Sequence, residues 1–209
     1  TVLASGSSSQ LTNMIYKFLG ATRGKNEIRG DISRYRQGRR NLGGMAYRGL
    51  IVFCGKLLSE AKPSLVELDY WGGRIISHEI VHEFQYQLAG YSWVGTFSWK
   101  LGVGPKWIRE GTASALELTV AHSSDTSEET PWFIEKGQND LSKLGGKVSD
   151  AGWDNNGVQI SAYAGLRLLE MTDTNAISRY YIQIGMGETP YDAFESVFEL
   201  TPEEFYSLE

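Results

Sequence analysis

The chain has 209 residues and a mass of 23.3 kDa, which suits one domain or a tightly joined pair of lobes. Hydrophobic residues make up 41% and charged residues 22%, a globular composition that excludes a disordered or fibrous chain. The net charge of -5 argues against nucleic acid as the main partner, and no apolar run approaches the roughly 20 residues of a transmembrane helix.

The first half of the chain predicts a helix, then strands, then two further helices. Residues 7–19 place apolar side chains at helical spacing after serines that can cap a helix. Residues 27–56 predict extended structure, within which residues 50–53 are apolar enough for an inner strand. Residues 71–89 predict a long amphipathic helix closed by Gly90, and Pro105 opens a second helix that ends near Val120.

The last third predicts helices only. Residues 157–171 have the period of a packed helix, and Asp173 or Thr174 can cap the next one. Thr189 and Thr201 each precede a proline, which is typical of a helix start. Short strands followed by helices predict an α+β fold, with a small mixed sheet beside a mainly helical body.

Two of the three histidines fall in the segment His78-Glu79-Ile80-Val81-His82. Residues four apart lie on one face of a helix, so both imidazoles can reach a single Zn²⁺. Glu79, about 100° round the helix, can take a proton from a metal-activated water. The alternative is that both histidines lie on a solvated helix face, where the neighbouring Glu83 would fit equally well.

The predicted zinc helix also carries an apolar stripe, which we expect to anchor it in a core. The stripe consists of Ile76, Ile80, Phe84 and Leu88. Gln85 shares the face of the two histidines, which we expect to open on a cleft.

A catalytic zinc site needs a third protein ligand, and Glu110 is the best candidate. It lies on the second helix, where Gly111 and Ala113 are small enough to let that helix approach the first closely. Glu117, seven residues on, returns to the same face and can hold a ligating imidazole through its second N–H.

Two other residues remain open as alternatives for the third ligand. Cys54 sits in an apolar strand, where a buried inert thiol is the simpler explanation. His122 follows the second helix in a polar stretch, which favours a surface position.

The pair of motifs resembles a known family. The segment from Trp107 to Ala113, with Glu110-Gly111 at its centre and downstream of His78 to His82, is similar to the gluzincin zinc metallopeptidases. The nearest resemblance is to peptidase MA-like bacterial domains, with a more distant one to the aminopeptidase-N group. It runs loosely from Gly43 to the C-terminus and implies that Glu110 is the third zinc ligand.

The resemblance implies a zincin-like fold, with the active-site helix between lobes, and a single metallopeptidase-like catalytic domain over residues 1–209. Within it, residues 1–70 would form a helix and sheet, 71–120 the zinc helices, and 121–209 a helical C-terminal part. Related enzymes often stabilise the oxyanion with a Tyr from a later helix, which suggests Tyr163 for that role.

The chain departs from the aminopeptidase pattern at one strand. In those enzymes a Gly-Ala-Met-Glu-Asn strand holds the free amine of the substrate through its Glu, whereas this chain has Ala46 in the matching segment 43–47. Endopeptidase action on a peptide or protein substrate is therefore favoured over aminopeptidase action. The loop of residues 91–104 is longer than in aminopeptidases, and its aromatic residues either form an apolar subsite or pack on the helices. These residues are Trp93, Phe97 and Trp99.

Two functions remain as alternatives to a zinc-dependent metallopeptidase. One is a zinc-retaining binding or regulatory module with little turnover, and the other is a non-peptide hydrolase with the same metal site. A run of arginines between Arg29 and Arg48 predicts a solvated strand face, or else a subsite for acidic peptides. The missing initial methionine and the habits of the family favour a secreted or extracytoplasmic bacterial location, and the sequence does not define the oligomeric state.

Overall fold

The computed structural model describes residues 2–5, 8–19, 26, 28–29, 32, 42–47, 49–55, 65–90, 98–122, 144 and 155–208. The chain falls into two compact units, Thr1–Glu83 and Phe84–Glu209. The long helix α3 (Leu65–Leu88) runs through the boundary between them. Most of the described residues are helical, which confirms the mainly helical body that the sequence predicts.

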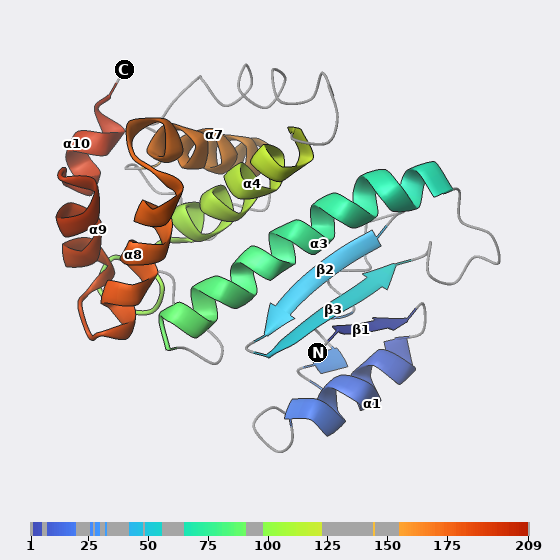
Figure 1. The fold of residues 1–209 in the computed structure, drawn as a ribbon. Helices are drawn as coiled ribbons and strands as arrows, with labels where there is room; N and C mark the ends of the chain where they lie inside the picture. The colour runs from blue at the N-terminus through green and yellow to red at the C-terminus, as the bar shows by residue number, and fades with distance from the viewer. Residues whose placement is uncertain are drawn as a thin grey trace. The chain divides into compact units, whose positions relative to one another are not determined.

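Three short strands of the first unit form one sheet (Figure 1). Strand β1 (Val2–Ser5) runs parallel to β3 (Leu50–Gly55), and β2 (Leu42–Tyr47) runs antiparallel to β3. The order β1-β3-β2 makes β3 the inner strand, as its apolar sequence predicts.

Alternate residues of β3 face opposite sides of this sheet. Leu50 and Val52 belong to a core with helix α1 (Ser8–Leu19), whereas Ile51 and Phe53 pack with Ile75 of α3. The core on the α1 side is completed by Leu11, Ile15, Ile28 and Ile32. Both faces of β3 are therefore covered, which explains why its sequence is apolar without alternation.

The hairpin between β2 and β3 is tied to α3. Gly49 has a φ of 79°, a conformation that glycine adopts without strain in short hairpin loops. Its backbone N–H donates to Oε1 of Glu83 at 2.5 Å. Glu83 therefore fixes α3 on the hairpin, a role that the sequence did not indicate.

Several boundaries in this unit differ from the sequence prediction. Ile28 and Ile32 are helical rather than extended, and their side chains are fully buried. Strand β1 was not predicted, because four residues carry too short a pattern and its pairing partner lies far along the chain. Helix α3 begins at Leu65, six residues before the predicted start at Trp71, and it ends beside Gly90 at a φ of 75° as predicted.

The predicted anchoring face of α3 is wrong. Ile76, Ile80 and Phe84 are exposed by 42%, 39% and 59%, so this stripe does not enter a core. The buried face of the described part of the helix is instead largely polar and is formed by Glu79, His82, Gln85 and Tyr86. Glu79 and His82, which belong to the histidine motif, are therefore among the buried residues of the helix.

In the second unit, helices α4 (Lys106–His122) and α7 (Asn155–Met171) pack closely together. A side-chain carbon at Gly111 would collide with the backbone carbonyl of Ser161, and one at Gly165 would collide with the carbonyl of Gly111. Gly111 therefore lets α4 approach α7, and not the first zinc helix as the sequence predicts.

An aromatic core holds the beginning of α4 against the C-terminal helices. Trp107 stacks on Phe205 with ring centroids 5.4 Å apart and an interplanar angle of 8°. The indole N–H groups of Trp99 and Trp107 both donate to the hydroxyl of Tyr206, at 3.2 and 3.0 Å. Trp99 is half-buried and packs on Trp107 of α4 as well as on Phe194, so this residue follows the alternative in which the aromatics of the loop pack on the helices. These contacts fix the first turn of α4, which precedes Glu110.

The predicted starts of the last three helices are confirmed. Asp173 caps α8 (Thr174–Gly185), and Thr189 caps α9 (Pro190–Phe198). Thr201 and Glu204 form a capping box at the start of α10 (Pro202–Tyr206). Caps depend on a few neighbouring residues, so they can be predicted from the sequence.

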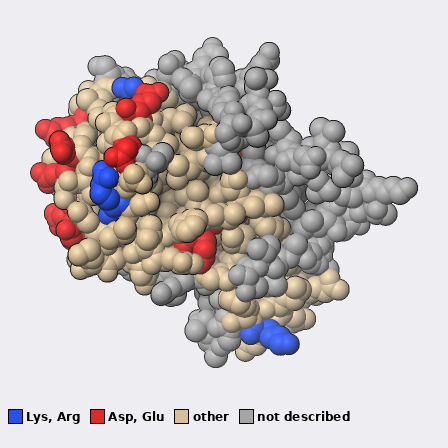
Figure 2. Space-filling view, viewed as in Figure 1, with Lys and Arg blue, Asp and Glu red and all other residues tan. Residues whose placement is uncertain are grey.

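The outer faces of these last helices are acidic. Residues 190–206 contain five carboxylates and neither Lys nor Arg. Figure 2 shows acidic side chains spread over the part of the surface formed by the C-terminal helices. The helices therefore turn aromatic residues inward and carboxylates toward solvent, the usual amphipathic pattern.

Candidate metal centre

The two histidines of the motif lie one turn apart on the same face of α3. Their rings meet edge to face, with centroids 4.6 Å apart. His82 is buried and His78 is half-buried. The helix therefore presents two imidazoles side by side, as the spacing predicts.

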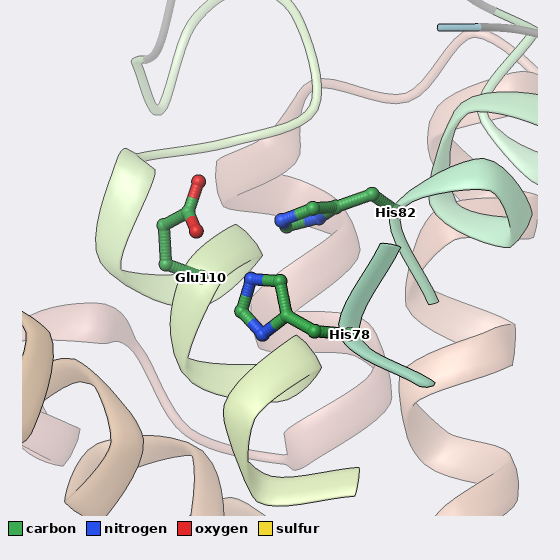
Figure 3. A group of neighbouring side chains, drawn as sticks. All are labelled: His78, His82 and Glu110. Atoms are coloured by element: carbon green, nitrogen blue, oxygen red, sulfur yellow. The ribbon is translucent and has the colours of Figure 1, made fainter. Parts of the chain in front are cut away.

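Glu110, the predicted third ligand, lies in the second turn of α4 and is buried. In the part of the chain that the structure describes, His78, His82 and Glu110 form the one group of side chains suited to hold a metal ion. One potential ligand atom from each residue lies within 4.8 Å of the other two. Figure 3 shows both imidazoles and the carboxylate directed toward a common point.

The three side chains fit a zinc ion in kind and in spacing. Two nitrogens and one oxygen are a ligand set of catalytic zinc sites, which keep a fourth position for water or substrate. Zinc lies roughly 2.0 to 2.2 Å from such ligands, so tetrahedral ligand atoms are roughly 3.4 Å apart. The observed limit of 4.8 Å is wider than this by an amount that small side-chain rotations can close.

Glu79 follows His78 on α3 and is also buried, with 7% of its surface exposed. Its burial separates it from an ordinary solvated glutamate, because a buried carboxylate is retained only where other groups compensate the loss of water. The sequence predicts it as the general base, and this role remains a prediction.

The carboxylate of Glu110 is held by the residue that precedes it. Nη2 of Arg109 donates to Oε1 of Glu110, and both side chains are only 10% exposed. Nη1 of the same guanidinium donates to the hydroxyl of Tyr86 at 2.6 Å. Arg109 therefore links the candidate ligand to a tyrosine one turn after His82.

Gln85 joins the end of α3 to α4. Its amide donates to the backbone carbonyl of Arg109 at 3.0 Å and to Oγ1 of Thr112 at 2.9 Å. Thr112 in turn donates to the carbonyl of Ile108 at 2.7 Å. Gln85 is thus a buried contact between helices, and the prediction that it faces an open cleft is wrong.

Tyr181 of α8 lies beside the same groups. Burial raises the pKa of Tyr181 above its ordinary value, while the hydroxyl of Thr112 and the positive charge of Arg109 act in the opposite direction. The charge of Glu110 raises it further. The sequence offers no signal for Tyr181, because its place depends on how α8 packs.

The remaining predicted site residues are distributed as follows. Glu117 lies on α4 and is buried, and Tyr163 lies on α7 and is half-buried, so their predicted roles stay predictions. Arg29 is exposed, as a solvated face requires, but it is helical and not part of the predicted strand. The side chains of Cys54 and His122, residues 93 and 97, and the arginines beyond Arg29 in the basic stretch lie outside the described residues.

The sequence did not indicate the polar groups that surround Glu110. Arg109 contacts its carboxylate directly, Tyr86 contacts Arg109, and Tyr181 lies close enough to be affected by the charge of Glu110. A signal was available for Tyr86, which continues the spacing of the two histidines by one more turn of the helix.

Comparison with known protein families, with curated proteins and with solved structures found no match to this chain. The resemblance to gluzincins is therefore carried by the motif residues themselves. No helix among the described residues combines the length and the apolarity needed to cross a membrane.

Proposed function

We propose that the protein is a zinc-dependent metallopeptidase of the gluzincin type, with a zincin-like fold. The observation that carries this proposal is the convergence of His78, His82 and Glu110, whose potential ligand atoms lie within 4.8 Å of one another (Figure 3). Three protein ligands of this kind leave a fourth position for solvent, which a purely structural zinc site does not need.

When bound, zinc supplies a water of lowered pKa and polarises the carbonyl group of a substrate. Glu79 acts as the general base, taking a proton from the attacking water and passing it to the leaving amine. The enclosed position of Glu79 supports this role, because a partly dry site strengthens the interactions of its carboxylate. A module that only binds its partner has no need of such a base.

We propose peptides as the substrate class, cleaved within the chain rather than at a free N-terminus. In the described sheet β2 is an edge strand, and an edge strand can pair with an extended peptide. Its Ala46 is a buried methyl group that cannot bind an ammonium ion. An aminopeptidase recognises the free amine of its substrate, and this chain has no carboxylate at position 46 to bind it.

A peptide-library digest that compares the zinc-loaded wild type with Glu79→Gln tests the proposal. We expect the wild type to cleave internal peptide bonds and Glu79→Gln to lose at least 100-fold in rate, since general-base catalysis is worth about 10² to 10⁴. The variant should keep its zinc, because Gln has the size of Glu and position 79 is not a ligand.

Ser9→Ala, an exposed change on α1, is the matched control and should cleave as the wild type does. Equal activity of Glu79→Gln and wild type would show that Glu79 is not the base. Zinc retention without cleavage of any peptide would favour the binding module or a hydrolase for non-peptide substrates.

A further inference from the structure

We infer that Arg109, anchored by Tyr86, positions the Glu110 carboxylate and thereby sets the metal affinity of the site. This inference rests on the proposed metal site. It assigns a role to two residues that neither bind the metal nor react with a substrate.

The geometry of the guanidinium carries the inference. Two nitrogens of one rigid group are used in different directions, Nη2 toward Oε1 of Glu110 and Nη1 toward the hydroxyl of Tyr86. The Tyr86 contact, at 2.6 Å, is a close one, slightly shorter than the roughly 2.7 to 3.2 Å usual for an N–H···O hydrogen bond. The planar fork fixes the direction of the carboxylate as well as its charge.

Arginine also suits the stereochemistry of a carboxylate ligand. A carboxylate offers two oxygens and about four lone-pair directions, so an oxygen held by Arg109 leaves acceptor capacity for a cation. Without this hold, the long Glu110 side chain would have to be ordered by the metal alone, at a cost in side-chain entropy. Arg109 thus keeps Glu110 in a rotamer suited to binding.

Burial of the pair does not by itself explain the arrangement. Arg109 and Glu110 are each only 10% exposed, and a buried ion pair often stabilises a fold no better than apolar residues of similar volume. A metal ion bound by Glu110 would give the ion pair a function. Groups that orient a metal ligand raise the affinity of the site for the metal.

The test is the zinc dissociation constant of Tyr86→Phe, measured by competition with a chelator, together with the visible spectrum of the cobalt-loaded protein. We expect zinc to bind about 10 to 100 times more weakly than in the wild type, the usual effect of losing such an orienting group. The cobalt spectrum should also change, because the carboxylate ligand is less firmly directed. A merely structural hydroxyl would alter neither.

Tyr180→Phe is the matched control. Tyr180 is a fully buried tyrosine whose hydroxyl donates to the carbonyl of Val103 at 3.5 Å rather than to Arg109 or Glu110. We expect its zinc affinity and cobalt spectrum to equal those of the wild type. A loss in Tyr180→Phe as large as that in Tyr86→Phe would mean that any buried hydroxyl has this effect, and the inference would fail.

Arg109→Lys and Arg109→Ala provide a second series. Lysine keeps the positive charge but lacks the planar guanidinium that can hold two groups at once. The zinc affinity of Arg109→Lys should therefore fall between that of the wild type and that of Arg109→Ala. If Arg109→Ala does not fold, Tyr86→Phe and Arg109→Lys still decide. Zinc affinities equal to the wild type in both would overturn the inference while leaving the proposed function intact, whereas a wild type that binds neither zinc nor cobalt would remove both.

Discussion

The amide of Gln85 makes two hydrogen bonds that connect the end of α3 with α4, to the Arg109 carbonyl and the Thr112 hydroxyl. Both bonds are buried, so water cannot replace them without entering the packed region. Gln85 lies three residues after His82 and contacts the turn that carries Glu110. Its contribution is therefore to hold the turn of α4 that carries Glu110, a candidate metal ligand.

Gln85→Leu should lower the free energy of unfolding by about 1 to 3 kcal/mol, since two hydrogen bonds each worth about 0.5 to 1.5 kcal/mol are lost. Urea denaturation of the metal-free protein measures this change directly. The control is Gln87→Leu, an exposed position on the same helix, which should change stability by no more than about 0.5 kcal/mol. Equal stabilities of the two variants would contradict the structural role of Gln85.

At the scale of residues, the sequence indicates the candidate ligands better than the residues that surround them. His78 and His82 can be found because ligand spacing and helical period are both local properties of the chain. Arg109 is adjacent to Glu110 in the sequence, yet its hold on the carboxylate depends on the Tyr86 hydroxyl 23 residues away. Such a contact follows from tertiary packing, which a single sequence does not display.

At the scale of elements, α3 shows why an apolar stripe does not settle which face is buried. Ile76, Ile80 and Phe84 are exposed, whereas the face with Glu79 and His82 is enclosed. Hydrophobic spacing predicts the helix correctly, but Gln85 and Tyr86, the buried polar residues at its end, hydrogen-bond to residues of α4 rather than to water. A buried polar face of this kind is characteristic of functional sites, where local rules are broken.

The C-terminal helices follow local rules closely. The Thr201 backbone N–H donates to the Glu204 carboxylate at 2.7 Å, and the Glu204 N–H donates to the Thr201 hydroxyl at 3.2 Å. The first of these hydrogen bonds, helped by the Thr201 side chain, lowers the pKa of Glu204 below its ordinary value of 4.5. The capping box therefore stabilises α10 most when Glu204 is ionised.

Glu204→Ala should lower the melting temperature near pH 7, and this loss should shrink as the pH falls below about 4.5. A depressed folded-state pKa gives stability that is fully present above the unfolded pKa and is lost as the pH falls through the folded one. Thermal unfolding of wild type and variant across this pH range measures the difference. A difference that stays constant down to pH 2 would contradict an ionised cap.

At the scale of the whole molecule, the helical character and the C-terminal helices could be predicted, but the complete sheet could not. Strand β3 has a clear apolar signal, whereas β1 is recognised only by its pairing with residues about 50 positions along the chain. Tertiary packing likewise decides that Gly111 serves the contact of α4 with α7.

The proposed metal site involves the whole molecule, because its three candidate ligands come from two helices. A cation held by α3 and α4 would bind the folded chain in preference to the unfolded one and would stabilise it by mass action. The folded chain should therefore bind one metal ion.

The most direct measurement is the number of zinc ions bound per chain in wild type and in Glu110→Ala, determined by metal analysis after dialysis against a weak chelator. We expect about one zinc per chain in the wild type and little or none in Glu110→Ala, because two imidazoles alone bind weakly. Circular dichroism of each sample establishes that it is folded. A folded wild type without zinc, or a Glu110→Ala variant that retains a full equivalent, would contradict the assignment of His78, His82 and Glu110 as the metal ligands.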